Sequence, residues 1–229
     1  MMSSSETEQR KAIEAYRYQL MGYGPFDIPK KKHWIILGSG PSSDDYAEEL
    51  LDEDTGIIAL NSAFRPLKYT TVSIQSHYED CYLGWYSFHK VDLVFIADPL
   101  HLGYRCIPAS AMNLFNYDDI AYFFPFKVRF FEKEMDLNRA FERTHTLFCK
   151  ASIISAAVHL LWRNGVKEAF YCGIDGGYGR GSRYKDIEVY NTKGRTFPNY
   201  DAAGLEMNWL AGKLKMDLKP LKKPEAVLA

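Results

Sequence analysis

Residues 33–43 read His-Trp-Ile-Ile-Leu-Gly-Ser-Gly-Pro-Ser-Ser, an apolar run that stops abruptly at glycines, a proline and small hydroxyl side chains. This pattern predicts a buried β-strand, a tight loop and the start of a helix. Without Cβ atoms, Gly38 and Gly40 would let a ligand approach the main chain, and Pro41 suits a first helical turn. With one of the following serines as a cap, free N–H groups of this loop are predicted to bind a nucleotide phosphate.

The loop matches the dinucleotide-binding pattern G-x-G-x-x-G only in part, because Ser43 stands where the third glycine would be. About 20 residues later, the predicted second strand ends in Asn61 rather than in an acidic residue, which argues against an ordinary NAD site. An amide both donates and accepts hydrogen bonds, so Asn61 suits a ribose or a base edge. The alternative is a glycine turn that only packs the strand against the helix.

The chain has 229 residues and a formal net charge of −1. We therefore expect one α/β core and no global basic field that would attract nucleic acid or an acidic membrane. The absence of any C-x-x-C pair favours reduced thiols over disulfides or a zinc site; the cysteines are Cys81, Cys106, Cys149 and Cys172. No apolar run approaches the length of a membrane span, so the sequence predicts a cytoplasmic protein without one.

Strand-like and helix-like segments alternate along the chain. The predicted strands after the first are 57–61, 71–75, 92–97, 168–173 and an edge strand at 214–218; the predicted helices are 6–21, 44–52, 151–162 and 202–213. Such alternation is typical of a doubly wound, mostly parallel α/β sheet. We expect an N-terminal helix and basic lead-in over 1–32, one domain over 33–219 and a tail over 220–229. Residues 99–148 are rich in aromatics without a clear period, and suit a core or an acceptor pocket.

Ligands of doubly wound sheets bind beyond the carboxyl ends of the strands. The residues predicted at these ends are Ser39, Asn61, Ser76, His77 and Asp98. For His77, ligand contact and a structural hydrogen bond are both open. The exposed-looking run Asp52-Glu53-Asp54 fits a metal-binding D-x-D pattern, but it precedes a strand and is interpreted as a solvated helix end.

A second phosphate site is predicted where the apolar helix at 151–162 begins, because Lys150 and Ser152 lie beside its free N–H groups. His159, inside that helix, is interpreted as a core histidine. The next strand ends in Gly173-Ile174-Asp175 and opens into a glycine-rich loop, 176–185, which is predicted to be a lid. Asp175 either caps this loop or contacts the ligand.

Four segments in order form a recognisable set: Gly-Ser-Gly-Pro-Ser at 38–42, Leu-Asn-Ser at 60–62, the small-residue helix from 151, and Val-Lys-Glu-Ala-Phe-Tyr-Cys-Gly-Ile-Asp at 166–175. This set resembles the bacterial sialyltransferases that use CMP-activated sugars. It is also similar to the wider group that holds the flagellin motility accessory factors and the hydroxymethylpterin pyrophosphokinase-like proteins. The resemblance covers 33–219 and implies a single Rossmann-like, GT-A-like domain.

The resemblance implies roles for individual residues. Tyr178 and Tyr184 keep the spacing of two tyrosines that donate hydrogen bonds to the departing phosphate. Lys150 falls where a basic residue faces the acid group of the donor sugar, and Arg195 is also assigned to the donor sugar. The predicted nucleotide site comprises Gly38, Ser39, Gly40, Pro41, Ser42, Asn61, His77, Ser152, Gly173 and Asp175.

The general base is the departure from that family, because Arg195 stands where the sialyltransferases have a histidine, and arginine stays protonated. His145 and Asp201 are the candidates for this role, each with a structural alternative. The sequence thus predicts a metal-independent, inverting glycosyltransferase with a CMP- or UDP-sugar as cosubstrate and no other cofactor. The acceptor is a glycan, a protein or a modified nucleobase, and the oligomeric state is open. The alternatives are ATP-dependent diphosphate transfer, with Asp98 and Asp175 holding magnesium, and an inactive nucleotide-binding protein.

Overall fold

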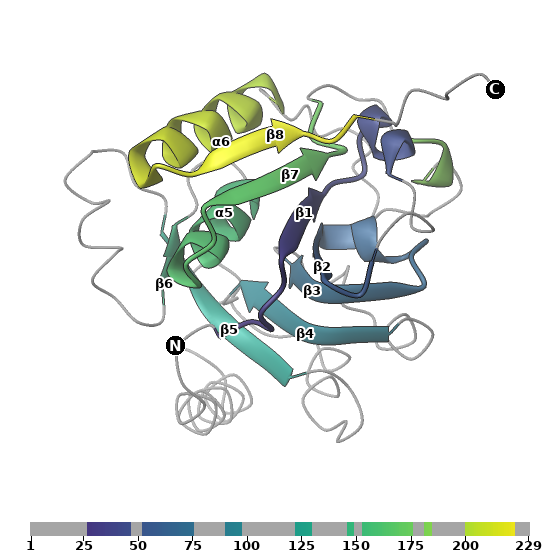
Figure 1. The fold of residues 1–229 in the computed structure, drawn as a ribbon, viewed down its shortest axis with the longest axis horizontal. Helices are drawn as coiled ribbons and strands as arrows, with labels where there is room; N and C mark the ends of the chain where they lie inside the picture. Colours follow the sequence, from purple (N-terminus) through teal and green to yellow (C-terminus); the bar gives the residue numbers. More distant parts are fainter. Residues whose placement is uncertain are drawn as a thin grey trace, which may run out of the picture.

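The computed structural model describes residues 27–46, 52–75, 90–97, 122–129, 146–148, 153–175, 181–184 and 200–222. These residues contain an eight-stranded sheet with the order β6-β5-β4-β3-β2-β1-β7-β8, in which every pair of neighbours is parallel (Figure 1). The strands are β1 (His33–Leu37), β2 (Thr55–Leu60), β3 (Tyr69–Gln75), β4 (Lys90–Ala97), β5 (Tyr122–Arg129), β6 (Thr146–Phe148), β7 (Glu168–Cys172) and β8 (Asp217–Pro220).

β1 and β2 are almost entirely apolar, as expected of strands that a parallel sheet buries on both faces. In β1 and β2, every residue from Trp34 to Leu37 and from Gly56 to Leu60 is buried. β3 differs, because it alternates apolar side chains with buried polar ones: Val72 and Ile74 alternate with Thr71, Ser73 and Gln75. The apolar members face the main core, so β3 is amphipathic although both of its faces are enclosed.

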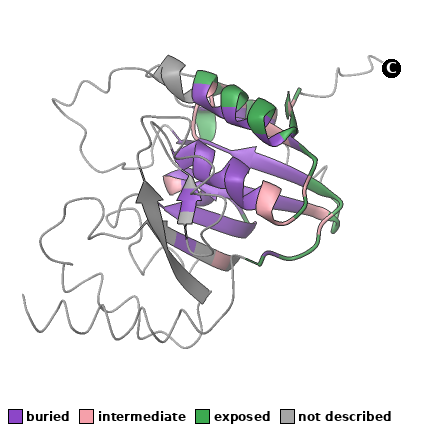
Figure 2. Ribbon diagram, turned by 90° about the vertical axis from the view of Figure 1, so that its left-hand side faces the viewer, coloured by how far each residue is buried: buried purple, intermediate pink, exposed green. Residues whose placement is uncertain are grey.

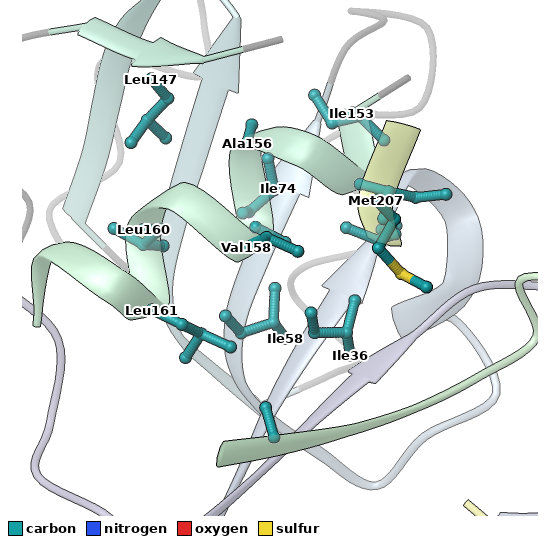
Figure 3. Close-up of a cluster of buried hydrophobic side chains, with 14 of the residues drawn as sticks. Ile36, Ile58, Ile74, Leu147, Ile153, Ala156, Val158, Leu160, Leu161 and Met207 are labelled. Atoms are coloured by element: carbon teal, nitrogen blue, oxygen red, sulfur yellow. The ribbon is translucent and has the colours of Figure 1, made fainter. Parts of the chain in front are cut away.

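Two helices cover one face of the sheet. These are α5 (Ile153–Arg163) and α6 (Tyr200–Leu214), and their inner sides pack on side chains from β1, β2 and β3 (Figure 3). The hydroxyl of Ser155 donates a hydrogen bond to the carboxylate of Glu206, which joins the two helices inside this core. Figure 2 shows the central strands and α5 as buried and the outer side of α6 as exposed.

The strand order reverses at β1, which pairs with β2 on one side and with β7 on the other. From β1 the chain adds β2 to β6 in one direction, whereas β7 and β8 extend the sheet the opposite way. The prediction of a doubly wound, parallel α/β fold is therefore confirmed. The predicted N-terminal helix lies outside the described residues. Within the described part of the chain, no helix is long and apolar enough to cross a membrane.

Several predicted boundaries were wrong. After the glycine loop the chain forms a short 3-10 helix, η1 (Pro41–Asp45), which begins before the predicted helix start at Asp44; most of that predicted helix, 47–51, lies outside the described residues. The edge strand is β8, two to three residues later than predicted, because α6 continues to Leu214 and the turn at Lys215 takes a positive φ of 54°. The aromatic region before residue 148 contains β5 and β6, which the prediction missed.

The acidic run Asp52-Glu53-Asp54 lies in an exposed turn before β2. This exposure agrees with the interpretation of the run as solvated. Thr55 Oγ1 donates to the Asp52 carboxylate over 2.6 Å, and this bond lowers the pKa of Asp52. Because parallel strands all begin at the same edge, this acidic turn lies at the amino edge of the sheet, opposite the carboxyl ends.

Candidate functional site

The loops after β1 and β7 meet where the strand order reverses, the position at which open α/β sheets bind their ligands. Their main chains continue the ladder beyond both strands: the Gly38 N–H donates to the Cys172 carbonyl and the Gly40 N–H donates to the Gly173 carbonyl, each over 2.9 Å. The segments 38–46 and 173–175 are therefore held together as one unit. This unit is the centre of the candidate site.

The glycines of this unit allow the two loops to approach each other closely, because they have no Cβ atom. A Cβ on Gly38 would lie 2.2 Å from the Gly173 carbonyl oxygen, and one on Gly40 would lie 2.6 Å from Asp175 Oδ2. Gly173 itself has a φ of +70°. The positions that a Cβ would take at Gly38 and Gly40 are thus filled by the loop after β7. The predicted contact of these glycines with a ligand stays a prediction.

The Ser42 N–H, which was predicted to help bind a phosphate, donates instead to Asp175 Oδ2 over 2.7 Å. The Ser42 hydroxyl is also engaged, because its oxygen accepts the Gly173 N–H over 2.8 Å. In this structure Asp175 therefore caps the loop after β1. An anion that used the Ser42 amide would have to displace this carboxylate.

Asn61 follows the last residue of β2 and begins the 3-10 helix η3 (Asn61–Phe64) with a positive φ of 49°. Asparagine tolerates this left-handed conformation better than most residues. The Asn61 carbonyl accepts a hydrogen bond from Gln75 Nε2 over 2.8 Å, which connects the carboxyl ends of β2 and β3. Asn61 is only partly buried.

The segment 181–184, which contains the 3-10 helix η6 (Ser182–Tyr184), packs on the loop after β1. The Gly181 N–H donates to the Ser39 carbonyl over 3.1 Å, and Asp44 Oδ1 accepts both the N–H and the hydroxyl of Ser182, over 2.7 and 3.0 Å. A Cβ on Gly181 would lie 2.1 Å from Ser43 Oγ, so a larger residue there would require the Ser43 side chain to move. We call this set of contacts the Asp44 clasp.

Tyr184 is almost completely buried, at 1% exposure, and its hydroxyl donates to the Ala63 carbonyl over 2.9 Å. The same residue thereby attaches the segment 181–184 to η3, beside the end of β2. Its predicted role as a donor to a departing phosphate stays a prediction. In the conformation described here, the phenol would have to leave the Ala63 carbonyl to take that role.

Sequence reasoning missed Arg183, which is exposed and lies with its guanidinium carbon 5.7 Å from the centre of the Tyr46 ring. Burial, together with the charges of Asp175 and Asp45, raises the pKa of the Cys172 thiol to about 12, and Arg183 acts in the opposite direction. The thiol is therefore protonated and is no nucleophile. Because the charges of Asp175, Asp45 and Arg183 all act on this thiol, the three side chains lie near the end of β7.

Two further predicted regions border the same edge of the sheet. Helices that connect parallel strands run antiparallel to them, so α5 and α6 begin at the carboxyl edge (Figure 1). Asp201 lies in the first turn of α6. Lys150 and Ser152 occur in the sequence between β6 and α5. The predicted site residues that fall outside the described residues are His77, His145, Lys150, Ser152, Tyr178 and Arg195.

No protein-family model matches the chain, and no curated protein matches it. Solved structures with a similar fold include the sialyltransferase CST-II in complex with a trisaccharide acceptor and CMP, at 18% identity and a TM-score of 0.44, over 86% of this chain and 84% of that one. CstII from Campylobacter jejuni in complex with the substrate analogue CMP-3FNeuAc has 19% sequence identity and a TM-score of 0.48, over 86% of this chain and 84% of that one. An α-2,3-sialyltransferase from Campylobacter jejuni in apo form has 15% sequence identity and a TM-score of 0.45, over 87% of this chain and 78% of that one.

Proposed function

We propose that the chain is a glycosyltransferase that moves a sugar from a nucleotide-activated donor to an acceptor hydroxyl, with inversion and without a metal ion. The observation that carries the proposal is the meeting of the loops after β1 and β7 at the reversal of the strand order, with Asn61 of the neighbouring strand in a left-handed conformation. The ordered sequence segments that resemble the CMP-dependent sialyltransferases support the same class of reaction.

In the proposed reaction, the acceptor oxygen attacks the anomeric carbon of the donor sugar as the bond from that carbon to the phosphate oxygen breaks. The electron pair of the broken bond leaves with the nucleotide, and the acceptor proton passes to a general base. Negative charge grows on the departing phosphate, so hydrogen-bond donors aimed at it lower the barrier. The proposed donors are Tyr178 and Tyr184, and the proposed bases are His145 and Asp201.

The nucleotide is proposed to lie over the ends of β1 and β2. Asn61 would contact the ribose or the base, because its side chain follows β2 directly and is partly accessible. Lys150 and Arg195 are proposed to face the donor sugar. Ser39 is partly exposed and belongs to the same loop as Gly40, and both are proposed to border the nucleotide.

A thermal-shift panel of CMP, UDP, GDP and ATP, each with and without magnesium, tests this function. We expect CMP or UDP to stabilise the protein without magnesium. Ligand at 100 times its Kd adds about 2.7 kcal/mol, and this corresponds to a rise in Tm of roughly 5 to 10 °C for a chain of this size.

A response to ATP that requires magnesium would instead support diphosphate transfer and overturn the proposal. A protein that responds to none of the four nucleotides would overturn any nucleotide-dependent function at this site. A CMP or UDP response without cleavage of any matching nucleotide sugar at high protein concentration would favour the inactive binding protein.

A further inference from the structure

We infer that Arg183 binds the phosphate of the nucleotide, and that the Asp44 clasp holds Arg183 near the point where the strand order reverses. The inference rests on the proposed function, because it names the group that receives the negative charge of that ligand. Arg183 belongs to η6, which lies beside η1 at the carboxyl edge of the sheet (Figure 1).

The Ser42 amide already has a hydrogen-bond partner in this structure. The carboxylate of Asp175 accepts a hydrogen bond from this N–H, which was predicted to bind a phosphate. A phosphate that binds here therefore needs another source of positive charge. Among the described segments 38–46, 173–175 and 181–184, Arg183 is the only basic residue.

The negative charge of the surrounding carboxylates makes a cation necessary for phosphate binding. Asp44, Asp45 and Asp175 bring three carboxylates to these segments, and they repel an anionic ligand unless a cation offsets them. An arginine suits this task because its planar guanidinium donates two parallel hydrogen bonds to a phosphate and stays charged at all relevant pH values. The Arg183 side chain is exposed, so it is accessible to a ligand.

The clasp fixes the backbone from which Arg183 extends. Asp44 holds Ser182 by two hydrogen bonds, and the guanidinium of Arg183 packs over the Tyr46 ring. Arg183 therefore follows directly on a residue whose backbone is held in place. Such preorganisation lowers the entropy that its side chain loses when a phosphate binds.

The test compares ligands with and without the phosphate. Isothermal titration calorimetry measures the affinity for CMP, cytidine, UDP, uridine and pyrophosphate. The proteins compared are the wild type, Arg183→Gln, Arg183→Lys and Lys32→Gln. We expect Arg183→Gln to weaken CMP, UDP and pyrophosphate binding about tenfold and to leave the nucleosides unchanged, as the loss of a charge-assisted contact implies. Arg183→Lys should have a smaller effect. Lys32→Gln removes the same charge from the exposed amino edge and should change nothing.

Two variants of Asp44 test the clasp. Asp44→Ala should weaken CMP binding although it removes a repelling charge, whereas Asp44→Asn keeps an acceptor for Ser182 and should bind CMP at least as well as the wild type. Equal losses for CMP and cytidine in Arg183→Gln, or no loss for either, would overturn the inference. A wild type that binds pyrophosphate through Arg183 but no nucleotide would refute only the proposed function, and one that binds neither would refute both.

Discussion

Replacement of Gly38 by alanine is expected to lower the free energy of unfolding by about 3 kcal/mol, the upper part of the range for overpacked sites. The added Cβ would lie 2.2 Å from the Gly173 carbonyl oxygen and 3.0 Å from its carbon. Both are backbone atoms, so relief requires the loops after β1 and β7 to separate. That separation weakens the bond from the Gly40 N–H to the Gly173 carbonyl. Urea unfolding measures the loss, and nucleotide affinity should fall with it.

Gly212→Ala is the matched control, because a Cβ at this exposed position of α6 meets no atom within 4 Å. In a helix interior alanine is favoured over glycine, so this variant should be more stable than the wild type by up to about 1 kcal/mol. A Gly38→Ala protein as stable as the wild type would refute the close contact between the two loops. It would also remove the main structural feature of the candidate site.

Stability is expected to fall steeply in acid because of His159. Its side chain is fully buried in α5 and stacks on Trp162 with 5.8 Å between ring centres. Burial, with a smaller contribution from the charge of Arg163, lowers the pKa of His159 to about 3. The unfolded chain, with a histidine pKa near 6.5, takes up a proton that the folded protein does not bind until the pH approaches 3. The histidine therefore reduces stability as the pH falls below about 6.5, by roughly 2 kcal/mol at pH 5.

The measurement is the difference in unfolding free energy between pH 7 and pH 5 for the wild type, His159→Leu and His33→Gln. Leucine at 159 keeps an apolar side chain in the core and removes the titrating group, so the difference should shrink by about 2 kcal/mol. His33→Gln changes an exposed histidine at the start of β1, and the difference should shrink less than in His159→Leu. An unchanged difference in His159→Leu would show that this histidine is not held neutral by burial.

The parallel sheet could be predicted from the sequence because its central strands are apolar runs with sharp ends. The run from Trp34 to Leu37 stops at Gly38, and the run from Ile57 to Leu60 stops at Asn61. β5 could not be predicted, because its mixture of aromatic residues, Pro125 and basic residues has neither the period of a strand nor that of a helix. Its place in the sheet depends on pairing with β4, which is a long-range contact.

The sequence indicated single residues of the candidate site but not the contacts between its loops. The glycines and Asn61 were singled out because their residue types carry a backbone meaning in the sequence itself. The contact between Asp175 and the Ser42 amide joins residues that are 133 positions apart, and no local pattern indicates it. The Asp44 clasp and the position of Arg183 depend on a similar long-range contact, 138 positions apart. These contacts decide which donors remain for a phosphate.

Amide chemical shifts during titration with CMP and UDP show directly whether a nucleotide binds where the loops after β1 and β7 meet. The largest changes are expected at Ser39, Gly40 and Ser42, at Asn61, at 173–175 and at Arg183, and cytidine should leave the Arg183 signals unperturbed. Changes confined to the amino edge of the sheet, around 30–33 and 52–54, or no changes at saturating nucleotide, would contradict binding at this position.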